Sequence, residues 1–285
     1  MSRVRRFGAT LQSEPAHAPE VPEPLLPRDQ NAVLLDRAAL EHEVERIIAV
    51  AEAAGVVLRV LGSIGVALHC PDAKALLPSF ERTYADIDFA AYARQAREVT
   101  AAITSLGYRE DREVSITSEG RRAIFDHPTA PQVHVDVFFD ELEFCHRIPL
   151  QGRLAADRPT IPLAELLLSK LQIVRLNEKD VVDTILLLLD HDFGAGDADV
   201  IDAGRIARLC AEEWGLWRTL TMNLDKVHTF ASSYPQLTDS RRERVITRTD
   251  RLKLAIDEIP KPFGWRMRDR IGDRRQWWTD VDEVR

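Results

Sequence analysis

Three aspartates that interrupt two apolar, strand-like segments constrain the fold of this chain most strongly. Asp86 and Asp88 alternate with other residues in the segment 85–90, and Asp136 lies inside the apolar segment 132–139. Side chains two residues apart on a strand point to the same face, so Asp86 and Asp88 would present their carboxylates side by side. If the two strands are neighbours in one sheet, all three carboxylates converge.

Adjacent carboxylates repel one another, and they stay ionised at neutral pH only beside a strong positive charge. Mg²⁺, or Mn²⁺ in its place, prefers oxygen ligands and supplies that charge. Two such ions roughly 3.5–4 Å apart could activate an attacking oxygen and stabilise a leaving pyrophosphate. The pattern therefore predicts a two-metal site at Asp86, Asp88 and Asp136, with phosphoryl or nucleotidyl transfer as its chemistry.

Gly62 and Ser63 stand where the strand-like segment 56–61 ends and a helical pattern begins. A helix N-terminus offers free N–H groups, a glycine lets a phosphate approach the backbone, and a serine hydroxyl adds a hydrogen bond. A Gly-Ser pair alone is more often a plain turn. Ahead of the three aspartates, it predicts a nucleotide-binding site.

The remaining pattern predicts an α+β fold, with a mixed sheet flanked by helices and followed by a helical C-terminal domain. The expected helices are 37–54, 64–69 and 92–106, and the expected strands are 56–61, 85–90, 108–117, 121–126 and 132–139. Beyond Pro162 the pattern stays helical to at least Ile259. We expect a flexible, proline-rich leader over 1–33, a catalytic domain over 34–160, and a helical domain with a locally basic tail over 161–285.

Lys170 interrupts the apolar face of a helix expected to begin near Pro162, where a lysine loses hydration unless it meets an anion. It is a candidate for nucleotide binding, although a lysine can also extend its ammonium to solvent. Asn177 is an expected N-cap. Asp180 would then lie in the first helical turn, so it has either a capping or a site role, and Asp183 and Lys179 are possible site residues.

These residues resemble the DNA polymerase beta-like nucleotidyltransferase superfamily. The resemblance covers roughly residues 37 to 192 and is greatest to the abortive-infection Eii-type (AbiEii) proteins, which include toxins of toxin–antitoxin pairs. The motifs that carry it are Gly62-Ser63, Arg82-Thr83 leading into Asp86-Ile87-Asp88-Phe89, Asp136, and the set Lys170, Arg175, Lys179-Asp180 and Asp183. The gap from Ser63 to Asp86 is longer than is usual in the superfamily, which implies an inserted loop near residues 70–81.

The resemblance implies an enzyme that moves a nucleoside monophosphate from an NTP to an acceptor hydroxyl and releases pyrophosphate. Asp86 and Asp88 would bind both metals, and Asp136 would complete the site and help to deprotonate the acceptor. Ser63 and Gly62 would hold the triphosphate, with Lys170 and Arg82 as further nucleotide-binding residues. The acceptor stays open among an RNA 3′ end, a protein side chain and a small molecule, and an antitoxin protein is a possible partner.

Composition adds limits. No stretch of about eighteen uncharged apolar residues suggests a membrane span, and the chain start lacks the apolar run of a signal peptide. Three scattered cysteines suit a reducing compartment, so we expect a cytoplasmic protein. The net charge is −8. An acidic chain of this kind is not expected to bind nucleic acid tightly through nonspecific phosphate contacts.

The C-terminal segment differs in charge from the rest. Residues 241–285 hold thirteen Lys or Arg against nine Asp or Glu, a net of +4, which leaves −12 for the remainder. Several arginines here alternate with Trp265, Trp277 and Trp278, so stacking on an RNA end is conceivable. We favour the alternative in which the tryptophans pack a terminal helix onto the domain and the arginines pair with Asp269 and Asp273.

Three functions remain open from the sequence. The first is an active nucleotidyltransferase. The second is an antibiotic- or small-molecule-modifying enzyme of the same chemistry, which would show an open acidic pocket for a cationic acceptor. The third is a non-catalytic nucleotide-binding relative.

Overall fold

The computed structural model describes residues 37–74, 76, 86–197 and 199–280. Every described element belongs to one compact unit, Val33–Arg285. The predicted leader and Arg82 lie outside the described residues.

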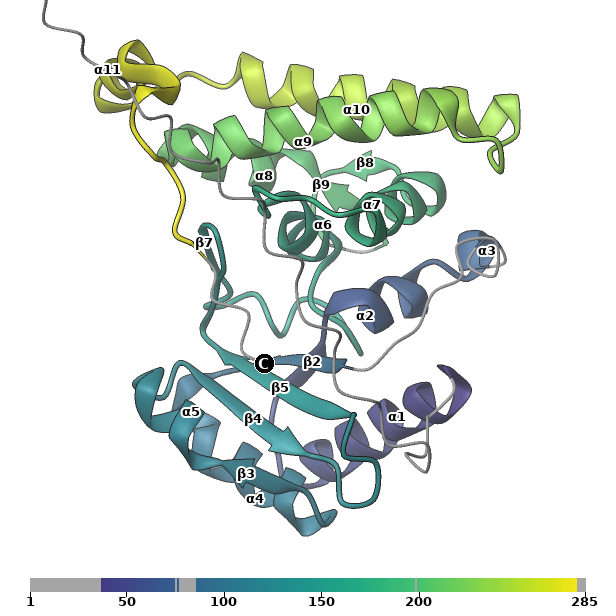
Figure 1. Cartoon of the computed structure of the whole chain (residues 1–285), viewed down its shortest axis with the longest axis vertical. Coiled ribbons are helices and arrows are strands. Elements are labelled where there is room, and N and C mark those ends of the chain that lie inside the picture. Colours follow the sequence, from purple (N-terminus) through teal and green to yellow (C-terminus); the bar gives the residue numbers. More distant parts are fainter. Residues whose placement is uncertain (1–36, 75, 77–85, 198, 281–285) are drawn as a thin grey trace, which may run out of the picture. The chain divides into compact units, whose positions relative to one another are not determined.

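A five-stranded mixed sheet carries the three aspartates (Figure 1). Its strands, in spatial order, are β1 (Leu58–Val60), β2 (Asp86–Ala91), β5 (His134–Phe139), β4 (Arg122–Asp126) and β3 (Arg109–Asp111). The central strands β2 and β5 run parallel, and every other neighbouring pair is antiparallel. The predicted strands 85–90, 121–126 and 132–139 are confirmed within one or two residues.

One face of this sheet is covered by an apolar core. Helices α1 (Arg37–Ala53) and α4 (Ala96–Ser105) contact each other, and their apolar residues join the core cluster on this face. Phe89 and Phe125 are fully buried in that cluster. The helices satisfy their own backbone groups while presenting apolar stripes to the sheet. The α+β prediction is therefore confirmed for this half.

The predicted strand 108–117 is wrong over its second half. The strand β3 ends at Asp111, and residues Arg112–Thr117 form helix α5. The Asp111 carboxylate accepts hydrogen bonds from the backbone N–H groups of Glu113 and Val114, at 3.0 and 3.3 Å. Alternating polarity predicted a strand here, but an aspartate that caps a helix N-terminus ended the strand early.

Two short helices follow β1. Helix α2 (Gly62–His69) begins two residues before the predicted start, and α3 (Pro71–Lys74) follows it. Similarly, the predicted helix 92–106 begins with a 3₁₀ turn, Ala93–Gln95, before α4. Helix α2 contacts β2 and also two helices of the C-terminal half.

The C-terminal half is helical, as predicted. It follows the hairpin of β6 (Glu141–Glu143) and β7 (Arg147–Pro149). Its helices are α6 (Leu163–Leu171), α7 (Glu178–Asp190), α8 (Ala203–Glu212), α9 (Trp214–Ser233), α10 (Asp239–Glu258) and α11 (Phe263–Ile271). A two-stranded parallel pair, β8 (Phe193–Gly194) with β9 (Ile201–Asp202), interrupts them, and a final 3₁₀ turn covers Gly272–Arg274. The predicted N-cap is confirmed, because Asn177 Oδ1 accepts a hydrogen bond from the Asp180 N–H at 2.9 Å.

A second apolar core continues from the second face of the sheet into these helices. It includes Val66 of α2, Phe138 of β5, Leu166 of α6 and Leu224 of α9. None of the described helices is apolar over a length that would cross a bilayer.

The C-terminal tryptophans pack onto the helical half, as the favoured alternative predicted. The Trp265 indole donates to the carbonyl of Cys210, and the Trp277 indole donates to Thr219 Oγ1. The prediction that Asp269 and Asp273 pair with arginines of the tail is wrong. Asp269 accepts from the Trp214 indole, and Asp273 pairs with Arg218, both of helix α9.

Candidate active site

The carboxylates lie together on the second face of the sheet. The parallel register places Asp88 opposite Asp136 and Asp86 opposite His134. Directly opposed side chains on neighbouring strands lie on the same face, and the strands themselves are about 4.8 Å apart. Asp86, Asp88 and Asp136 therefore gather on one face, as the alternation on each strand requires.

Gly62 connects this carboxylate group to the Gly-Ser segment. Its φ is +66°, and a Cβ at this position would lie 2.1 Å from Asp88 Oδ2. Any side chain at this position would displace the Asp88 carboxylate, so the glycine is favoured by packing as well as by its backbone conformation. The first turn of α2 thus lies against one of the predicted metal ligands.

Without a bound cation, repulsion between these carboxylates opposes their ionisation. Burial, together with the nearby Asp136 and Asp86 carboxylates, raises the pKa of Asp88 to about 7, although Lys170 and Arg122 oppose the shift. Burial likewise raises the pKa of Asp136, against the opposing effect of Arg122. Carboxylates in this state favour the binding of a positive charge.

Arg122 of β4 already supplies one positive charge, and the sequence analysis missed it. Its Nε donates to both carboxylate oxygens of Asp136 at 2.9 Å, and its Nη2 makes a further short contact with Oδ2. The antiparallel register explains the contact, because Ile124 lies opposite Asp136 and Arg122 is two residues away on the same face. The available signal was the alternation of Arg122, Ile124 and Asp126 in the predicted strand 121–126.

The residue types fit a hard divalent ion, since all three predicted ligands are carboxylates. As they stand, however, no three His, Cys, Asp or Glu side chains among the described residues are close enough to hold a metal ion. Asp136 is turned toward Arg122 instead. The donor set is therefore suitable, and one of its members is occupied by a guanidinium.

A cavity of about 360 Å³ opens over the carboxylates. Its charged and polar lining is mainly acidic: Asp86, Asp88, Asp111, Asp126 and Asp136, with His134 and Arg122. Phe138, Phe144 and Ile124 form its apolar part. Phe138 and Phe144 meet edge to face with ring centroids 5.1 Å apart, and the Arg122 guanidinium lies 5.3 Å from the Phe138 ring centroid.

The structure brings four other predicted site residues into a separate ionic cluster. Lys170 Nζ lies 3.0 Å from Asp180 Oδ1, 2.9 Å from Asp183 Oδ2 and 3.5 Å from Ser63 Oγ. Ser63 Oγ donates to Asp183 Oδ2 at 3.0 Å. Burial lowers the pKa of Lys170, but the two carboxylates outweigh it and hold that pKa above its usual value. This cluster joins α2 to α6 and α7.

The predicted site residues Lys179, Asp180 and Asp183 all lie in helix α7. Asp180 has both a place in the first turn of α7 and an ion pair with Lys170. Lys179 is exposed in that same turn. Asp183 is almost completely buried, with 1% of its side chain exposed.

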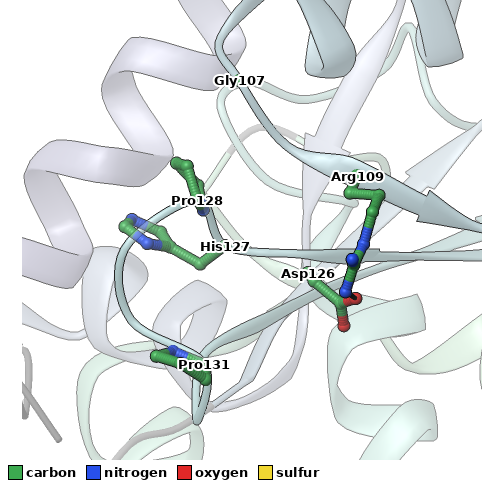
Figure 2. A pocket seen from close by; sticks show the side chains of 6 residues that line it. All are labelled: Gly107, Arg109, Asp126, His127, Pro128 and Pro131. Atoms are coloured by element: carbon green, nitrogen blue, oxygen red, sulfur yellow. Dashed lines mark hydrogen bonds and ion pairs between the residues drawn. The ribbon is translucent and has the colours of Figure 1, made fainter.

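A second hollow lies at the other end of β3 and β4 (Figure 2). It measures about 470 Å³ and is lined by Gly107, Arg109, Asp126, His127, Pro128 and Pro131. Its charged groups satisfy each other, because Arg109 pairs with Asp126 at 2.9 Å. His127 Nδ1 accepts from the N–H groups of Thr129 and Ala130. This hollow therefore has one carboxylate among its lining residues, against five in the cavity over the sheet.

No family model matches the chain, and no curated protein matches it. Among solved structures, the chain is similar to a solution structure of the antibiotic-resistance factor ANT(2'')-Ia, at 14% sequence identity and a TM-score of 0.36. That match covers 53% of this chain and 84% of the other. A TM-score this low supports no shared function, so the candidate site stands on its own residues.

Proposed function

We propose that this protein is a metal-dependent nucleotidyltransferase that moves a nucleoside monophosphate from an NTP to an acceptor hydroxyl and releases pyrophosphate. The observation that carries the proposal is the contact of Gly62 with Asp88, opposite Asp136 in the sheet. It joins a helix start suited to binding phosphate and a carboxylate group in one place. Neither part is diagnostic alone, and their direct contact supports a common substrate.

Asp86, Asp88 and Asp136 would hold the Mg²⁺ or Mn²⁺ ions of such a site. When bound, the ions would neutralise the carboxylates and polarise the transferred phosphate. The free N–H groups at the start of α2 would bind the triphosphate. Asp136 would accept the proton of the acceptor hydroxyl on one of its carboxylate oxygens.

Lys170 has a different place in this proposal than the sequence suggested. A direct contact with phosphate would require its ammonium to leave two carboxylates in a mostly buried setting. Its contacts instead hold Asp183, which in turn accepts the Ser63 hydroxyl hydrogen bond. We therefore assign Lys170, Asp180 and Asp183 to positioning Ser63 and the start of α2.

The acidic cavity favours a cationic small molecule as the acceptor. Asp111 and Asp126, the latter paired with Arg109, extend the acidic lining beyond the three proposed metal ligands, and the one arginine of the lining among the described residues is tied to Asp136. A polyanionic RNA end would meet repulsion on this surface. None of the tail arginines that the structure describes lines the cavity. An aminoglycoside-like, hydroxylated polyamine matches the charge of this cavity better than RNA does.

The test is transfer from each α-³²P-labelled NTP, with Mg²⁺ or Mn²⁺, to hydroxylated polyamines, to total RNA and to the protein itself. The control is the Asp86→Ala/Asp88→Ala variant. Label on a polyamine that disappears in the variant would support both the chemistry and the acceptor class. Label on RNA would retain the chemistry and overturn the acceptor. Metal-dependent NTP binding without any transfer would favour the non-catalytic alternative, and no NTP binding would overturn the proposal.

A further inference from the structure

Arg122 occupies the carboxylate that the proposed metal site needs. Three of its contacts go to Asp136, and both oxygens of that carboxylate are engaged. A forked guanidinium of this kind is a strong partner for a carboxylate. The Asp136 side chain is only 10% exposed, so solvent contributes little to its charge balance.

No other arginine or lysine lines the cavity among the described residues. Lys170, which does not line the cavity, forms ion pairs with Asp180 and Asp183. Asp86, Asp88 and Asp136 therefore share one lining cation, and the cluster keeps a net negative charge. A guanidinium and a divalent ion at this place would compete for the same oxygens.

We propose that Arg122 is an internal counter-cation that occupies Asp136 in the metal-free protein and withdraws from it when a divalent cation is bound. Arg122 is thus a positioning residue, acting through Asp136 on the affinity and occupancy of the metal site. This inference rests on the proposed function, because it concerns the same carboxylates.

The side chain is placed so that it can withdraw without moving the sheet. Its backbone is fixed by Ser118, whose hydroxyl accepts from the Arg122 N–H at 3.2 Å and donates to the Arg122 carbonyl at 2.9 Å. The side chain itself is 28% exposed and lines the open cavity. Rotation about its side-chain bonds would carry the guanidinium from Asp136 into the cavity, where Asp111 and Asp126 lie.

The test is the affinity of the metal-free full-length chain for Mn²⁺, measured by electron paramagnetic resonance and by calorimetry at fixed ionic strength. We expect Arg122→Gln to bind Mn²⁺ about tenfold more tightly than the wild type, because the repulsion and competition of one positive charge are removed. Arg122→Lys keeps the charge without the fork and should change the affinity by less than about threefold. If Arg122 only supported the fold, Arg122→Gln would lower the Mn²⁺ affinity or leave it unchanged.

Two controls isolate the effect. Arg147→Gln removes an exposed arginine of β7 that pairs with Glu141, outside the cavity, and should leave Mn²⁺ affinity unchanged. Asp136→Asn should weaken binding, and the double variant Asp136→Asn/Arg122→Gln should lose the gain seen in Arg122→Gln. Thermal unfolding of each variant establishes that it is folded.

The outcomes separate this inference from the proposed function. Equal or weaker Mn²⁺ binding by folded Arg122→Gln, with wild-type binding intact, would overturn the competition and leave the transferase proposal standing. A gain that persists without Asp136 would also overturn it, because Arg122 would then act on the cavity as a whole. Absence of Mn²⁺ binding in both the wild type and Arg122→Gln would overturn the metal site and this inference together.

Discussion

The two faces of the five-stranded sheet are built from the same strands, and both pack apolar residues, but only one of them also carries a cluster of carboxylates. One face holds Phe89 and Phe125, fully buried against α1 and α4. The other holds Asp88, Asp136 and Arg122 beneath an open cavity. Neighbouring residues in the chain, such as Asp88 and Phe89, therefore serve opposite purposes.

The difference shows how a strand can combine stability and chemistry. Burial of large apolar side chains on one face stabilises the fold by about 1.5–3 kcal/mol for each residue. This stabilisation allows the fold to form despite the cluster of like charges on the other face, which by itself destabilises the metal-free protein. Truncation of an apolar side chain should consequently cost more stability on the core face than on the cavity face.

The largest effect is expected on the core face. Phe125→Ala should lower the free energy of unfolding by about 4 kcal/mol, since it removes a fully buried ring and leaves a cavity. Ile124→Ala, one residue earlier on the cavity face, is the matched control and should cost about 1 kcal/mol. Urea denaturation measures both. Equal losses would mean that the two faces are packed alike.

A second effect concerns the ionic cluster that joins α2 to the helical half. Lys170→Met should lower the free energy of unfolding by about 3 kcal/mol, because Asp180 and Asp183 would lose their shared partner in a mostly buried place. Adding Asp183→Asn should restore part of that loss. If Lys170→Met is as stable as the wild type, the ion pairs of Lys170 do not stabilise the fold, and the positioning role that we assign to this lysine is wrong.

A third effect tests the contact between the Gly-Ser segment and the carboxylates. Gly62→Ala and Gly55→Ala both place a side chain at positive φ, +66° and +72°, but only at Gly62 does the new Cβ meet an obstacle. Gly55→Ala should cost about 1 kcal/mol of stability and leave transfer activity intact. Gly62→Ala should cost about 2 kcal/mol and also reduce transfer at least about tenfold, because it displaces Asp88. Similar activities in the two variants would separate Gly62 from the site.

The smallest effect concerns pH. The folded pKa of Asp88, about 7, exceeds its usual value of 3.8, so the folded state binds more protons than the unfolded state between those limits. Its favourable contribution is complete below about pH 4 and is lost as the pH rises through about 7. The metal-free protein should lose stability over this window. Asp88→Asn should reduce that loss, to which Asp136 with its raised pKa also contributes, and should gain about 1–2 kcal/mol at pH 8, a value reduced because the Asp88 side chain is partly exposed.

A series of thermal unfolding measurements from pH 4 to pH 8, in chelator, tests this sign. Saturating Mg²⁺ should stabilise the wild type at pH 8 and have little effect on Asp88→Asn. A wild-type protein whose stability rises with pH over this window would contradict the charge balance described for the cluster.

Much of the architecture could be predicted from local sequence. The alternation in 85–90 and 132–139 placed β2 and β5, and the Asn177 side chain marked the start of α7. Residues 112–117 were not predictable from alternation, because the helix cap at Asp111 competed with the strand pattern and won. The contact of Arg122 with Asp136 escaped prediction because it depends on which strands pair and in what register.

The sequence by itself determined that Asp86 and Asp88 would share one face of a strand, since this follows from the period of the backbone, and that Gly62 would stand at the start of a helical pattern. Only the tertiary structure decided that Asp88 presses against Gly62, that Arg122 occupies Asp136, and that Lys170 is held by Asp180 and Asp183. The residues that these contacts join are from 10 positions apart, for Lys170 and Asp180, to 26 positions apart, for Gly62 and Asp88. Packing and strand register bring such residues together, and no local pattern encodes either one.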